Sequence, residues 1–70
     1  MTVTIKEHIN EYTYISLEIK NQWGMSYYEV QACQMYSDGT CGNPFINMIY
    51  SMDEKEKALA TFNRYKRKYT

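Results

Sequence analysis

The sequence has few of the residues that usually build a small core and no charge excess of either sign. It contains only two leucines, Leu17 and Leu59. Its formal net charge is zero, which excludes attraction of the whole molecule to nucleic acid or to an anionic membrane. The uncharged stretch Phe45 to Met52 contains Asn47 and Ser51, and it is far shorter than the roughly 20 apolar residues of a membrane-spanning helix. We therefore expect no membrane partner.

The amino terminus lacks the pattern of a targeting signal. Met1 to Ile5 alternates threonine with β-branched apolar residues, and Lys6-Glu7-His8 follows at once. We expect a cytoplasmic protein. A chain of 70 residues has room for one hydrophobic core, so residues 1–70 should form a single domain.

Catalytic and metal-binding patterns are also missing. His8 is the only histidine, and with Cys33 and Cys41 it supplies three ligands where a structural zinc site uses four. The carboxylates of Asp53 and Glu54 stand where a helix start favours acids for structural reasons. We therefore predict no enzyme activity, no metal and no cofactor.

Cys33 and Cys41 stand on either side of a predicted turn. In a reducing cytoplasm we expect both to remain thiols. Their placement across the turn leaves a disulfide geometrically open.

Tyrosine, by contrast, is abundant, with eight residues in the chain. A domain of this size cannot bury eight large rings, each with a polar hydroxyl group, so several should meet water or a partner. This composition indicates contact with another molecule.

Alternating polar and apolar residues predict an antiparallel sheet of three or four strands. The strands are expected at residues 2–5, 12–20, about 25–36 and 45–50. Turns are expected near residues 21–24 and 37–44, where asparagine, glycine and proline gather. Residues 7–10 have little pattern; a hairpin connection is favoured there, with a helical turn as the alternative. Ile15, Leu17 and Ile19 should share the core face with Tyr28, Val30 and Ala32.

Ser51 to Glu54 has the spacing of a capping box and predicts the start of a helix that runs to about Tyr69. Its apolar stripe contains Ala58, Phe62, Tyr65 and Tyr69, with Leu59 on the flank. The predicted fold class is α+β, with this C-terminal helix packed on one face of the sheet.

The sheet face turned away from the helix is the predicted protein-binding surface, because tyrosine and methionine amid mixed charges are typical of interfaces. The predicted partner-binding residues are Tyr12, Tyr14, Tyr27, Gln31, Met35 and Asp38. Two alternatives stay open. One is that strand propensity alone accounts for the tyrosines, and the other is that the face packs against itself in a homodimer.

The basic end of the helix suggests another partner. Arg64, Lys66, Arg67 and Lys68 alternate with tyrosines, a composition suited to phosphates and stacked bases. Cations are also expected there because they complement the helix dipole. Nucleic-acid binding through these residues is the alternative prediction.

In its size, its richness in tyrosine, lysine and asparagine, and its strands followed by a capped helix, the chain resembles short proteins of phages and mobile elements of low-GC bacteria. Anti-CRISPR proteins are among them. The resemblance implies a non-enzymatic inhibitor that binds a host protein or ribonucleoprotein complex of a defence system. Because the chain is neutral, a wedge against a protein surface or a nucleic-acid channel is expected rather than mimicry of DNA.

Overall fold

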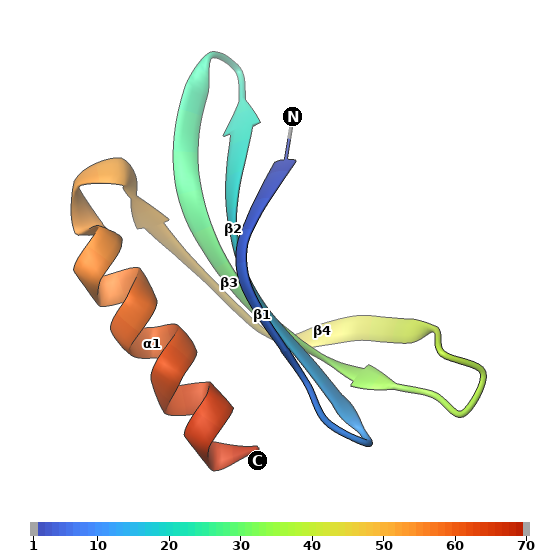
Figure 1. Cartoon of the computed structure of the whole chain (residues 1–70). Coiled ribbons are helices and arrows are strands. Elements are labelled where there is room, and N and C mark those ends of the chain that lie inside the picture. The colour runs from blue at the N-terminus through green and yellow to red at the C-terminus, as the bar shows by residue number, and fades with distance from the viewer. Residues whose placement is uncertain (1, 70) are drawn as a thin grey trace.

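The computed structural model describes residues 2–69 and shows one antiparallel sheet with a single helix along one face (Figure 1). The strands lie in chain order: β1 (Thr2–Ile9), β2 (Thr13–Gln22), β3 (Met25–Met35) and β4 (Cys41–Ser51). A 3₁₀ turn, η1 (Met52–Glu54), then leads into helix α1 (Lys55–Lys68). This arrangement confirms the predicted α+β fold.

The first turn lies later in the chain than predicted. β1 continues to Ile9, so His8 belongs to a strand, opposite Ile15, and not to a turn. The Asn10 side-chain oxygen makes the reversal by accepting from the amides of Tyr12 and Thr13 at 2.9 and 2.7 Å. Tyr12 therefore lies in the turn, and the prediction that placed it in the second strand was wrong.

The last turn is shorter than predicted, because β4 starts at Cys41 rather than Phe45. Asp38 Oδ1 accepts from the Thr40 amide at 3.0 Å and from its hydroxyl group at 2.7 Å, and Gly39 has a positive φ of 87°. Together these close the reversal within residues 36–40. Pro44 fits inside β4 because this strand is at the sheet edge, next to a register shift opposite Cys33.

The core lies between α1 and the sheet. Its buried members are Ile15, Leu17, Tyr28, Val30, Ala32, Ala58 and Phe62. Tyr65 and Tyr69 are partly buried against this cluster, as the helical stripe predicted. Tyr50 also packs there, and its hydroxyl group bonds to Thr61 Oγ1 at 2.6 Å, which ties β4 to α1.

The predicted capping contact is present at the helix start. Glu54 accepts a hydrogen bond from the Ser51 amide at 3.2 Å. The first turn after Ser51 is the 3₁₀ turn η1, and the α-helix proper begins at Lys55.

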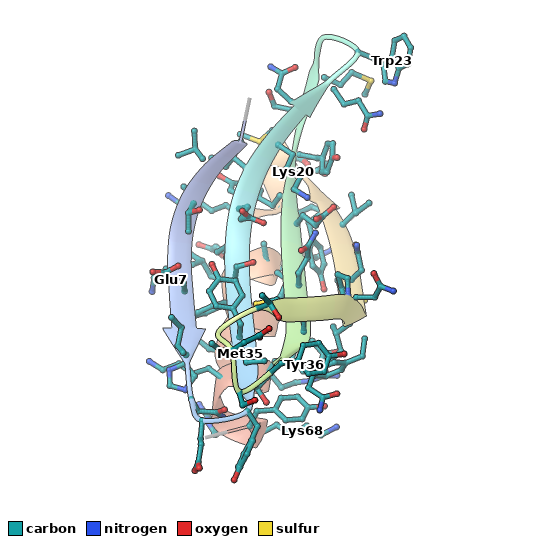
Figure 2. All side chains as sticks on the ribbon, turned by 90° about the vertical axis from the view of Figure 1, so that its right-hand side faces the viewer. Glu7, Lys20, Trp23, Met35, Tyr36 and Lys68 are labelled. Carbon is teal, nitrogen blue, oxygen red and sulfur yellow. The ribbon has the colours of Figure 1, made fainter. Side chains whose placement is uncertain are left out.

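We call the sheet surface opposite α1 the open face. Near their connecting turn, β3 and β4 bend away from α1, and the start of β4 passes in front of the sheet (Figure 2). Two register shifts in the β3–β4 pairing accompany this bend. Ser16, Glu29 and Cys33 are buried even though they belong to the open face. The open face is thus less exposed than a flat sheet would be.

Candidate functional site: an exposed tryptophan on the central hairpin

Two of the predicted contact residues, Tyr14 and Tyr27, share the open face but are not neighbours. Tyr14 pairs with Cys33, whereas Tyr27 pairs with Lys20, six residues further along β2. At about 3.3 Å per residue, this separation is about 20 Å. Tyr14 and Tyr27, although predicted for one binding surface, therefore do not form one cluster of rings.

The other predicted residues lie toward the Tyr14 end of the sheet. Gln31 is half-buried opposite Asn47, and Met35 ends β3 (Figure 2). Asp38 is exposed in the β3–β4 turn, where its carboxylate is engaged by Thr40. Tyr12 is exposed in the β1–β2 turn beside Lys68 of the helix end.

Tyr14 is engaged within the sheet. Its hydroxyl group donates to Glu7 Oε2 at 2.8 Å. Burial and this contact with a carboxylate raise the pKa of Tyr14 to about 12. The ring is held by its neighbours, so contact with a partner is not needed to explain it.

Lys20 balances the carboxylates at the centre of the open face. Glu18 and Glu29 lie directly opposite each other in the β2–β3 ladder. Lys20 Nζ lies 2.5 Å from Oε1 of Glu29, which is only 5% exposed. The hydrogen bond to Glu29 raises the pKa of Lys20, despite an opposing effect of burial. This ion pair explains a buried carboxylate on the face without any ligand.

The hairpin joining β2 and β3 projects beyond both neighbouring strands. Pairing with β1 reaches Lys20 and pairing with β4 reaches Tyr27, so residues 21–26 stand alone as a two-stranded tip (Figure 1). Asn21 Nδ2 donates to Ser26 Oγ at 3.3 Å across this tip. Residues 21–26, which we call the hairpin tip, carry no charge.

Trp23 and Gly24 form the two-residue turn of the hairpin tip. Their φ angles are 59° and 76°, and the flanking Gln22 and Met25 pair with each other. Positive φ at both central positions is characteristic of a type I′ turn, whose first position favours asparagine or glycine. Among residues 2–69, Trp23 is the only non-glycine residue with positive φ.

The Trp23 side chain points into solvent, away from the sheet (Figure 2), and is 91% exposed. Met25 beside it is 71% exposed. Sequence reasoning treated residues 21–24 as turn chemistry alone and missed this site. A large aromatic residue directly before the glycine of a hairpin was the available signal.

The basic end of α1 offers a more dispersed surface than predicted. At about 100° per residue, Arg64, Arg67 and Lys68 fall on one side of the helix, while Lys66 points away from them. The tyrosines between them are partly buried in the core, and Arg64 and Lys68 lie over the Tyr65 and Tyr69 rings at 5.4 and 5.5 Å. Nucleic-acid binding through this end stays a prediction.

Within residues 2–69, no three His, Cys, Asp or Glu side chains converge as metal ligands would. Both cysteines are free thiols, Cys33 buried and Cys41 exposed. No helix of the same region is long and apolar enough to cross a membrane.

No family model, curated protein or solved structure matches this chain.

Proposed function

We propose that this is a non-enzymatic binding protein that inserts its hairpin tip into a pocket of a partner protein, with Trp23 as the anchor. The observation that carries the proposal is a 91% exposed tryptophan at a φ of 59°. Asparagine or glycine would occupy that position at lower conformational cost, and the ring gains no burial there. Contact with a partner supplies the missing reason, since tryptophan is enriched among the residues that dominate binding energy.

The hairpin tip indicates the chemistry of the partner surface. Residues 21–26 carry no charge, and they present an indole ring, a thioether and polar amide and hydroxyl groups. Lys20, the nearest cation, is paired with Glu29. The fitting surface is therefore an uncharged apolar pocket with hydrogen-bonding groups at its rim.

Of the residues predicted from the sequence to bind a partner, Tyr27 remains a contact residue here, because it lies at the base of the hairpin tip. Its hydroxyl group donates to Gln22 Oε1 at 3.5 Å. The likeness to small phage and mobile-element inhibitors favours a host protein or ribonucleoprotein complex as the partner. Blocking a pocket of that complex would make the protein an inhibitor.

The test compares three forms of the protein as bait in lysate of a low-GC bacterium: wild type, Trp23→Asn and Tyr12→Asn. Tyr12→Asn is the matched control, because it also replaces an exposed aromatic residue in a hairpin turn. We expect wild type and Tyr12→Asn to capture the same partner. Trp23→Asn should bind it at least about tenfold more weakly, the loss typical of an interface anchor.

The captured partner is then purified and titrated into the protein. Because Trp23 is the only tryptophan of the chain, its emission reports on the hairpin tip. We expect the emission of Trp23 to shift to shorter wavelength as the ring leaves water. The emission of the partner's own tryptophans is measured separately and subtracted. Equal binding by Trp23→Asn, or loss of binding only in Tyr12→Asn, would refute the proposal.

A further inference from the structure

The outer edge of β4, which faces away from β3, is suited to pair with a further strand. Its pairing with β3 is regular from Ile46 to Ser51. On this stretch Met48 and Ile49 are 42% and 63% exposed. We propose that β4 pairs antiparallel with β4 of a second copy, which makes a homodimer with one continuous sheet.

Charge supports a second copy as the occupant. The chain carries no charged residue from Cys41 to Met52, the whole of β4 and one residue beyond. Pairing of identical strands often places like charges near each other, which is destabilising. Because β4 carries no charge, two copies of it can pair without this repulsion, and a charged partner strand would find no opposite charge on β4.

The opposite edge of the sheet differs. β1 carries Lys6 and Glu7, and its register shifts between Thr4 and Lys6. A bulge and charged side chains are the features by which edge strands avoid pairing with other chains. The β4 stretch from Ile46 to Ser51 has no proline, no bulge and no charge.

The side chains of β4 also complement themselves. A two-fold axis at Met48 would set this residue opposite its own copy and Ile46 opposite Tyr50 of the second chain. On the other face, Asn47 would oppose Ile49. Apolar residues thus meet apolar residues on the helix side, and both α1 helices cover the same face of the joined sheet.

The test is the mass of the protein in solution by size exclusion with light scattering, at about 1 to 200 µM. We expect a mass of twice 8.4 kDa at the upper concentrations. Ile49→Lys should give the monomer mass, since the two lysines would be diagonal neighbours on the open face of the joined sheet, about 7–8 Å apart, where like charges repel. Ile9→Lys should remain dimeric, because Ile9 is a similarly exposed residue, at 55%, on the protected edge β1.

Hydrogen exchange of the wild-type protein provides a second readout that needs no variant. Amides of β4 that point outward should become protected as concentration rises, whereas those of β1 should not. A monomer mass at every concentration, open-ended aggregates, or a dimer that survives Ile49→Lys would overturn the inference. The inference is independent of the hairpin tip, so Trp23→Asn should dimerise like the wild type.

Discussion

At the scale of single residues, the charges of the open face are balanced by one lysine. Lys20 stands beside two carboxylates that face each other across β2 and β3, and it bonds to the buried one, Glu29. A carboxylate that loses such a partner keeps the full cost of burial. Lys20 is therefore a structural residue.

We predict that Lys20→Met lowers the free energy of unfolding by about 1–3 kcal/mol, because Glu29 is left buried without its partner. Lys20→Arg should stay within about 0.5 kcal/mol of wild type, since it keeps the charge. Urea denaturation followed by circular dichroism measures both. Equal stability of all three proteins would show that Glu29 finds another partner.

The two cysteines should differ in reactivity. Burial, together with a hydrogen bond to Cys41, raises the pKa of Cys33 from 9.0 to about 11. At pH 8 only about one Cys33 in a thousand is then a thiolate, the reactive form. We predict that iodoacetamide modifies the exposed Cys41 first and Cys33 at least about tenfold more slowly, as measured by peptide mass spectrometry.

The same shift predicts how stability depends on pH. A raised pKa in the folded state means that the folded protein holds its proton more tightly than the unfolded chain. This contribution is fully present below about pH 9 and is lost as pH rises toward 11.

Unfolding in urea should equalise the rates at which iodoacetamide modifies the two cysteines. Equal rates in the folded protein would contradict the buried position of Cys33.

At the scale of elements, α1 holds the sheet through Phe62, which is 2% exposed. Phe62→Ala should cost about 3–5 kcal/mol by leaving a cavity. A chain of 70 residues has a total stability of only about 3.5–10 kcal/mol, so little of this variant should remain folded. Thermal denaturation tests this, with the exposed Asn63→Ala as control on the same helix.

The β3–β4 turn depends on the ionised form of Asp38. Hydrogen bonds from the Thr40 side chain and amide lower the pKa of Asp38 below its ordinary 3.8. A lowered pKa stabilises the turn above about pH 3.8, and this contribution is lost as pH falls through the folded-state pKa. An NMR titration of the Thr40 amide should therefore show a midpoint below 3.8, and Asp38→Asn should abolish it. A midpoint at or above 3.8 would mean that these bonds are not formed in solution.

Sequence patterns were sufficient where one face of an element is buried. The alternation from Thr13 to Ile19 and the stripe of α1 both predicted the correct core. They failed where pairing decides the outcome. The extent of β4 depends on a bulge beside Pro44, and the place of Tyr27 depends on its register with β2.

The candidate site was missed for the same reason, although the residue before the glycine of the predicted turn was visible in the sequence. Whether Trp23 stands at the end of a hairpin depends on the pairing of Gln22 with Met25, which makes the loop two residues long. Composition indicated tyrosines as the contact residues, but Tyr28 is buried, and Tyr50, Tyr65 and Tyr69 pack partly buried against the same core. Among residues 3–69, the most exposed large apolar side chain is instead that of the single tryptophan.

At the scale of the whole molecule, the exposed apolar side chains of the two proposed contacts lie in two separate places, the hairpin tip and the edge of β4. The hairpin tip projects from one end of the sheet, and the edge of β4 runs along one side. α1 covers one face of the sheet. The net positive charge of this helix offsets the net negative charge of the rest of the chain. The two proposed contacts, through the hairpin tip and through the β4 edge, therefore use separate parts of the molecule.

A residue retained for contact with a partner can lower the stability of the fold, and the positive φ of Trp23 predicts such a cost. Urea denaturation of Trp23→Asn, followed by circular dichroism, tests this most directly and needs no partner. We predict that the variant gains about 0.5–1 kcal/mol of stability, because asparagine adopts positive φ more readily than a bulky residue. A loss of stability would show that the indole ring supports the fold, and would contradict this prediction.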